Sequence, residues 1–147
     1  MYKRQDSARY QLLTKAFEIA RDMFPFGTGF ATFGSYYSGV YYSSVYAAYG
    51  LSNINGLRIG ASQFISDSFW PMILGQSGYF GLLSYIFAVT MLLKAIQRIR
   101  KVENSYYAAA MSGICYLIIV SMAESAFVHP IAVPIAMMIG AFLGKCE

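Results

Sequence analysis

Arg9 is the first residue whose type and position could support chemistry. It shares helical spacing with Leu13, Ala16 and Ala20, so it lies on the apolar side of the helix that this spacing predicts. A guanidinium removed from water needs a partner, and its planar fork suits bidentate binding of phosphate. Arg9 is therefore a candidate anion ligand. An internal ion pair, or a side chain that extends to the lipid headgroups, would explain the same spacing.

Asp67 is the second candidate. It precedes a long apolar run and is followed by Ser68. A carboxylate at such a position could act as a general base or orient a hydroxyl acceptor. It could equally be the N-cap of a helix that starts near Phe69.

Tyrosines and further ionisable residues complete the candidate set. Aromatic rings stack on the apolar faces of sugars, and they also anchor proteins at membrane interfaces. The tyrosines in question are Tyr36, Tyr37, Tyr41, Tyr42, Tyr46 and Tyr49. The ionisable residues expected on the same side of a membrane are Arg58, Glu124 and His129.

The composition is that of an integral membrane protein or a piece of one. Of 147 residues, 57% are hydrophobic and 12% are charged, whereas a soluble domain carries about 25% charged residues. An aromatic content of 17% excludes disorder, and two cysteines are too few for a disulfide scaffold. A net charge of +4 without a basic, aromatic-lined stripe argues against a nucleic-acid partner. The sequence contains no zinc or nucleotide motif, so we expect no metal and no cofactor.

Three apolar runs predict three transmembrane helices, at about residues 71–93, 106–123 and 126–143. Each is close to the ~20 residues that a membrane-crossing helix needs. The third contains Pro130 and Pro134, so its helix should either start near Pro130 and run short or kink at Pro134. Small residues at every third position, Gly75, Gly78 and Gly81, predict a helix-packing face in the first run.

Basic residues set the predicted orientation. The positive-inside rule places the loop between the first two spans in the cytoplasm, together with the C-terminus. The residues that define this side are Lys94, Arg98, Arg100, Lys101 and Lys145.

Residues 1–70 would then form an outer region that precedes the membrane region 71–147. An amphipathic helix is predicted over residues 6–24, capped by Asp6 or Ser7 and stopped by Pro25. Its apolar positions are Leu12, Leu13, Ala16, Phe17, Ala20, Met23 and Phe24. Residues 26–66 are rich in Gly, Ser and Tyr and should form a loop with short helical pieces, with a turn at Asn55-Gly56.

The order of these features resembles the C-terminal part of the bacterial O-antigen ligase and O-antigen polymerase family. An arginine on an amphipathic helix is followed by Pro25-Phe26-Gly27-Thr28-Gly29-Phe30. Asp67-Ser68-Phe69-Trp70 comes next, and then Gln76-Ser77-Gly78-Tyr79-Phe80-Gly81-Leu82 opens a membrane span. The resemblance covers most of this chain but only the last part of a typical family member.

The resemblance implies a polytopic protein of the bacterial inner membrane. It also implies transfer of glycans from undecaprenyl diphosphate to a sugar hydroxyl at the periplasmic face, without a metal or a nucleotide sugar. Arg9 would fall at the family arginine that binds the diphosphate. Asp67-Ser68 stands where the ligases carry histidine and asparagine, which favours a polymerase over a ligase. Gln76 stands where many members have glutamate.

The expected fold is therefore all-α, with three membrane spans that belong to a larger helix bundle. The expected function is polymerisation of lipid-linked oligosaccharide repeats, with Arg9 and Asp67 as catalytic residues. The predicted substrate-binding residues are Arg58, Tyr36, Tyr37, Tyr41, Tyr42, Glu124 and His129.

The expected partners are the lipid-linked glycan, membrane lipids and N-terminal helices of the same protein. The opening peptide Met1-Tyr2-Lys3-Arg4-Gln5 resembles an adapter-derived tail, so we expect the natural protein to begin upstream. Two alternatives stay open. One is a stand-alone three-span protein that packs against a partner, and the other is ligase-type transfer to lipid A core.

Overall fold

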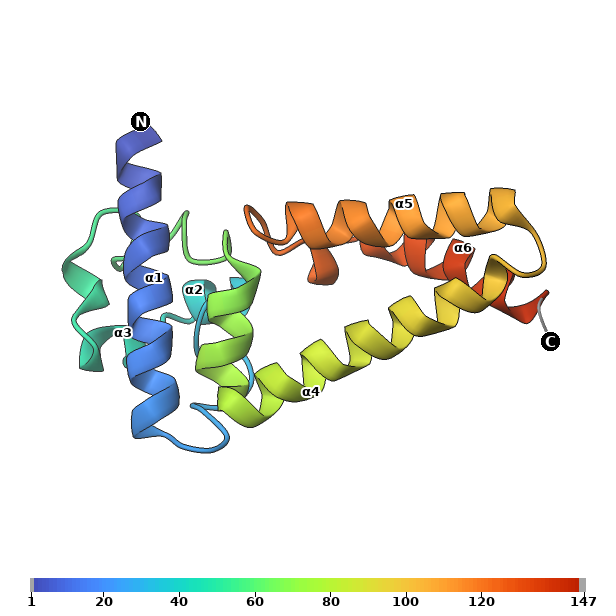
Figure 1. The fold of residues 1–147 in the computed structure, drawn as a ribbon. Coiled ribbons are helices and arrows are strands. Elements are labelled where there is room, and N and C mark those ends of the chain that lie inside the picture. Colours follow the sequence, from blue (N-terminus) through green and yellow to red (C-terminus); the bar gives the residue numbers. More distant parts are fainter. Residues whose placement is uncertain (1, 146–147) are drawn as a thin grey trace. The chain divides into compact units, whose positions relative to one another are not determined.

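The computed structural model describes residues 2–145, and in that range every regular element is helical (Figure 1). This confirms the predicted all-α class. The elements in chain order are α1 (Tyr2–Asp22), α2 (Tyr36–Val40), α3 (Ser44–Ala48), η1 (Leu51–Asn53), α4 (Phe69–Ile99), α5 (Asn104–Val120), η2 (Ala126–Val128) and α6 (Ala132–Gly144). The described part of the chain divides into two compact units, with the boundary between Leu83 and Ser84, inside α4.

Helix α4 contains the first predicted span and extends beyond it at both ends. Within residues 2–145 it is the one helix long and apolar enough to cross a membrane, and only 6% of its apolar stretch is buried. The helix is broken at Gly78, whose φ of 64° and ψ of −165° are not helical. Such angles lie in a region of the backbone map that is open essentially only to glycine.

The second and third predicted spans are shorter helices. Helix α5 has 17 residues and starts after Glu103, whose carboxylate accepts a hydrogen bond from the N–H of Ser105. The third run divides into η2 and α6, and α6 has 13 residues. This helix starts just after Pro130 and runs short, which is one of the two predicted outcomes. Pro134 falls in its first turn, where a missing N–H costs little.

The second unit is held together by α5 and α6. Its core contains Ile96, Ile99, Ala110, Ile114 and Ile139. The rings of Tyr106 and Phe142 stack with their centroids 4.7 Å apart. This packing joins α5 and α6 along one side, while many of their remaining apolar side chains stay exposed.

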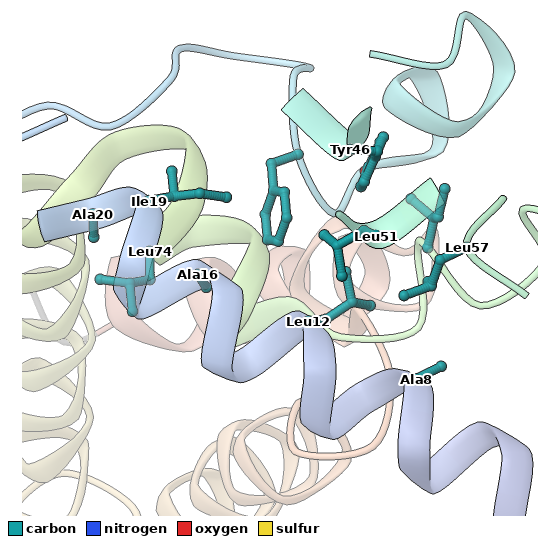
Figure 2. Packing of buried hydrophobic residues seen from close by; sticks show 11 residues of the cluster. Ala8, Leu12, Ala16, Ile19, Ala20, Tyr46, Leu51, Leu57 and Leu74 are labelled. Atoms are coloured by element: carbon teal, nitrogen blue, oxygen red, sulfur yellow. The ribbon is translucent and has the colours of Figure 1, made fainter. Parts of the chain in front are cut away.

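Helix α1 differs from its prediction at both ends and on one face. It begins at Tyr2, so neither Asp6 nor Ser7 caps it, and it ends at Asp22. Its buried face consists of Ala8, Leu12, Ala16, Ile19 and Ala20 (Figure 2). The predicted apolar positions Leu13, Phe17, Met23 and Phe24 are exposed instead, because the rest of the first unit covers only one side of the helix.

The segment after α1 folds back over its buried face. Tyr46, Leu51, Leu57 and Leu74 meet α1 in one hydrophobic cluster (Figure 2). Short helices form where serines can cap them: Ser35 caps α2. The predicted Asn55-Gly56 turn is present, with the N–H of Leu57 bonded to the carbonyl of Ile54 at 3.0 Å.

Candidate functional site

The two glycine-rich segments that carry the family resemblance are in direct contact. The break at Gly78 leaves the last carbonyls of the preceding helical turn without N–H donors inside the helix. Loop N–H groups satisfy them: Thr28 donates to the carbonyl of Gly75 at 3.0 Å, and Gly29 donates to that of Gln76 at 2.9 Å. Beyond the break, the N–H of Phe80 donates to the carbonyl of Pro25 at 3.4 Å.

Glycines at both sides of this contact allow the backbones to approach. A Cβ on Gly27 would lie 2.6 Å from the carbonyl oxygen of Gly75, and a Cβ on Gly78 would overlap the carbonyl oxygen of Pro25. A Cβ on Gly75 would overlap the ring of Phe33. The sequence predicted that Gly75 and Gly78 make a helix-packing face. In the structure they receive a loop instead.

Gln76 locks the same loop through its side chain, which is 8% exposed. Its Nε2 donates to the carbonyl of Phe33 at 2.5 Å, and its Oε1 accepts from the N–H of Ala31 at 3.2 Å. Sequence reasoning gave Gln76 no role. No signal in the sequence points to this role, because neither the burial of the amide nor the break at Gly78 can be read from the sequence.

Arg9 lies at the edge of the buried face of α1, as its spacing predicts. Its Nε is buried and has no hydrogen-bond partner among the residues that the structure describes. The ion pairs in that part of the chain, Lys15–Glu18 at 2.6 Å and Arg21–Asp22 at 3.7 Å, do not involve Arg9. No ion pair of Arg9 is found among the side chains that the structure describes, which begin at Ala8. An unsatisfied buried donor costs about 1–3 kcal/mol.

Asp67 is half-buried. It directly follows Ser66, which lines a small cavity. Ser68, not Asp67, directly precedes α4. The cavity has a volume of about 250 Å³ and is open on one side. It is lined by Ser35, Tyr36, Gly39, Val40, Ser62, Gln63, Ile65 and Ser66. None of these described lining residues is charged, so the cavity offers hydroxyls, an amide and one aromatic ring, which suits a neutral, hydroxyl-rich ligand.

The tyrosines divide into exposed and buried groups. Tyr36, Tyr37 and Tyr41 are exposed, and the first two rings meet edge to face with centroids 5.7 Å apart. Tyr42 instead packs against Tyr46 and donates its hydroxyl to the carbonyl of Leu57 at 2.9 Å. Tyr36, Tyr37 and Tyr41 are the rings of this group that are open to a ligand, and Tyr36 lines the cavity.

Tyr46 is fully buried. Its hydroxyl oxygen accepts from the N–H of Gly34 at 2.8 Å and lies 2.7 Å from the hydroxyl of Ser38. Burial raises the pKa of Tyr46 to about 12, although both hydrogen bonds lower it. The ring thus holds the start of α2, and with it one wall of the cavity.

Of the remaining predicted ligands, Arg58 belongs to the first unit but does not line the cavity. Arg58 is exposed in a tight turn in which the N–H of Ala61 donates to its carbonyl at 3.0 Å. Glu124 and His129 belong to the second unit, and both are exposed. Among the described residues, no group of three or more His, Cys, Asp or Glu side chains could hold a metal ion.

Comparison with known proteins returns no relative: no family model, no curated protein and no solved structure matches this chain.

Proposed function

We propose that this chain is the C-terminal part of a membrane enzyme that polymerises oligosaccharide repeats linked to undecaprenyl diphosphate. The observation that carries the proposal is Arg9, a half-buried arginine whose Nε has no partner among the described residues. A guanidinium suits a bidentate anion such as a diphosphate.

The proposed reaction is a glycosyl transfer. The acceptor hydroxyl attacks the anomeric carbon, the bond between that carbon and the diphosphate oxygen breaks, and undecaprenyl diphosphate leaves. Arg9 stabilises the negative charge that grows on the leaving diphosphate. The carboxylate of Asp67 orients the acceptor hydroxyl and takes its proton.

The cavity before Asp67 supports a sugar as the second ligand. Its uncharged lining and the ring of Tyr36 match the hydroxyls and apolar faces of a saccharide. Asp67 directly follows Ser66 of this lining, and the proposal requires its carboxylate to reach an acceptor sugar held in the cavity. In the proposal the reaction takes place at the periplasmic face of the inner membrane, as the resemblance implies.

The test is polymer formation by the protein in its complete gene context. Arg9→Ala should abolish the glycan ladder on a gel, and Asp67→Asn should do the same. Arg21→Ala is the matched control, because Arg21 lies on the same helix and is exposed. With equal protein levels on an immunoblot, a normal ladder from Arg9→Ala would exclude Arg9 from the reaction.

A second candidate is a membrane protein that acts by packing against a partner. The uncovered apolar side chains favour it, among them Phe17 on α1 and Met137 on α6, which are 50% and 70% exposed. In this case Arg9→Ala would leave every glycan product unchanged, and crosslinking would join the chain to one defined protein. Ligase-type transfer would differ from both, since its product is a single transfer to lipid A core rather than a ladder.

A further inference from the structure

Four phenylalanines are exposed where the loop after α1 meets the break in α4. We name them the phenylalanine cap: Phe24, Phe26, Phe30 and Phe80, which are 71%, 66%, 90% and 62% exposed. Phe26 meets Phe80 edge to face with ring centroids 5.9 Å apart, so the cap joins the loop to the helix. The ring of Phe24 lies beside that of Tyr79 in a tilted arrangement, with centroids 6.5 Å apart.

The cap is held outward by the backbone rather than left loose. Gly29 is bonded to the carbonyl of Gln76, and Phe30 follows it directly. The hydroxyl of Thr28 donates to the carbonyl of Gly75 at 3.1 Å, and the Thr28 and Thr32 hydroxyls lie 2.6 Å apart. The loop therefore presents its rings from a backbone that is hydrogen-bonded to α4 at Thr28 and Gly29, with both threonine hydroxyls also bonded.

Along the chain, charged residues border the cap only at the end of α1, where Arg21 and Asp22 precede Phe24. No charged residue lies between Asp22 and Arg58, or between Asp67 and Lys94. Protein interfaces carry a polar, solvent-accessible rim, whereas a lipid surface requires none. Phe80 also belongs to the first turn of the apolar stretch of α4 that follows Gly78, so the cap is continuous with the one described helix that could cross a membrane.

We propose that the phenylalanine cap inserts into the lipid bilayer, at the boundary between headgroups and acyl chains, and fixes the first unit to the membrane surface. Aromatic and apolar side chains at this depth are the usual anchors of proteins that lie on a membrane. The cap would set the height of α1 and of the cavity above the bilayer. The inference does not rest on the proposed glycan chemistry, because it uses neither Arg9 nor Asp67.

Fluorescence quenching by lipids tests the insertion. The full chain is reconstituted into phosphatidylcholine and phosphatidylglycerol vesicles, with Trp70, its only tryptophan, replaced by phenylalanine. Phe30→Trp then reports from the cap, and Tyr41→Trp is the control, since Tyr41 is 81% exposed in the same unit but outside the cap. Phe30→Trp should emit at shorter wavelength and lose intensity when the acyl chains are brominated. Tyr41→Trp should be quenched by aqueous iodide instead.

Two results would overturn the inference. Iodide quenching of Phe30→Trp as strong as that of Tyr41→Trp would place the cap in water. A short-wavelength emission without quenching by brominated lipid would place it against protein, either a second copy or other helices of the same enzyme. Phe26→Trp repeats the measurement at a second cap position, and circular dichroism shows that each variant keeps its helices.

Discussion

The side-chain amide of Gln76 donates to the backbone carbonyl of Phe33 across a nitrogen–oxygen distance of 2.5 Å. On its other side the same amide accepts from Ala31, whose φ of 61° is left-handed. One buried side chain thus needs both a donor and an acceptor to hold the loop on the broken helix. Neither a carboxylate nor an apolar side chain can supply both.

Gln76→Glu tests this requirement. At neutral pH the carboxylate can still accept from Ala31, but it faces the carbonyl of Phe33 without a proton. We expect a loss of about 2–3 kcal/mol in the free energy of unfolding, because a buried charged group loses its partner. A protonated carboxyl can again donate to the carbonyl of Phe33, so the pKa of the introduced Glu should be raised. The stability that protonation restores should then be lost as pH rises through that pKa.

The measurement is the melting temperature in detergent between pH 4 and pH 8. Gln97→Glu is the control, because Gln97 is exposed on α4 and its replacement should melt like the natural chain at every pH. A melting temperature of Gln76→Glu that does not depend on pH relative to this control would contradict the two-sided role of Gln76.

Gly78→Ala should be among the most damaging small substitutions in the first unit. The alanine would need a backbone conformation that is essentially restricted to glycine, and its methyl group would overlap the carbonyl of Pro25. We expect a loss of roughly 3 kcal/mol in the free energy of unfolding, with faster proteolysis of residues 23–34. Gly140→Ala is the control, since a Cβ on Gly140 meets nothing within 4 Å. Equal melting of the two variants would mean that the break does not need a glycine.

The sequence predicts the elements of this fold better than their contacts. The helical class, the Asn55-Gly56 turn and the short third apolar helix all follow from local signals. The docking of Thr28 and Gly29 on the break in α4 does not, because hydrogen bonds between distant segments leave no periodic trace. The same holds for α1. Its apolar arc is wider than the face that the core covers, and periodicity alone cannot tell Leu12 from Leu13.

The candidate site shows the same division. The position of Arg9 on an apolar face predicted a poorly hydrated guanidinium; in the structure its Nε is buried and the residue as a whole is half-buried. The tyrosines could not be separated by type alone, because exposed Tyr36 and buried Tyr46 come from the same Gly- and Ser-rich stretch. Only the fold reveals that the Tyr46 hydroxyl is committed to Gly34 and Ser38.

Tyr46 predicts a loss of stability at high pH. Its pKa is about 12 in the folded chain, and that of an unfolded tyrosine is about 10. Below pH 10 both states hold the proton, and as pH rises from 10 towards 12 the unfolded state ionises first. The folded state should therefore lose on the order of 3 kcal/mol over this range.

Tyr46→Phe isolates this effect. At pH 8 the variant should be less stable by about 1–2 kcal/mol, because Gly34 and Ser38 lose a partner. The difference between the natural chain and the variant should shrink above pH 10, since phenylalanine does not ionise. Thermal unfolding followed by circular dichroism at pH 8 and pH 11 measures both values. Tyr41→Phe is the control and should match the natural chain at each pH. If the difference in stability between the natural chain and Tyr46→Phe is the same at pH 8 and pH 11, the shifted pKa is refuted.

Arg9→Met separates a functional arginine from a structural one. Methionine removes the buried Nε–H of Arg9, which has no described partner, and keeps an apolar side chain of similar length. The two expectations that follow hold if the role of Arg9 is to bind an anion. The free energy of unfolding should then stay equal or rise by about 1 kcal/mol, while polymer formation is lost. Arg21→Met is the control, because it removes an exposed arginine from the same helix and should change neither property. A lower melting temperature for Arg9→Met would show that Arg9 supports the fold. Loss of polymer in that variant would then say nothing about a diphosphate, and Asp67→Asn alone would have to carry the test of the proposed reaction.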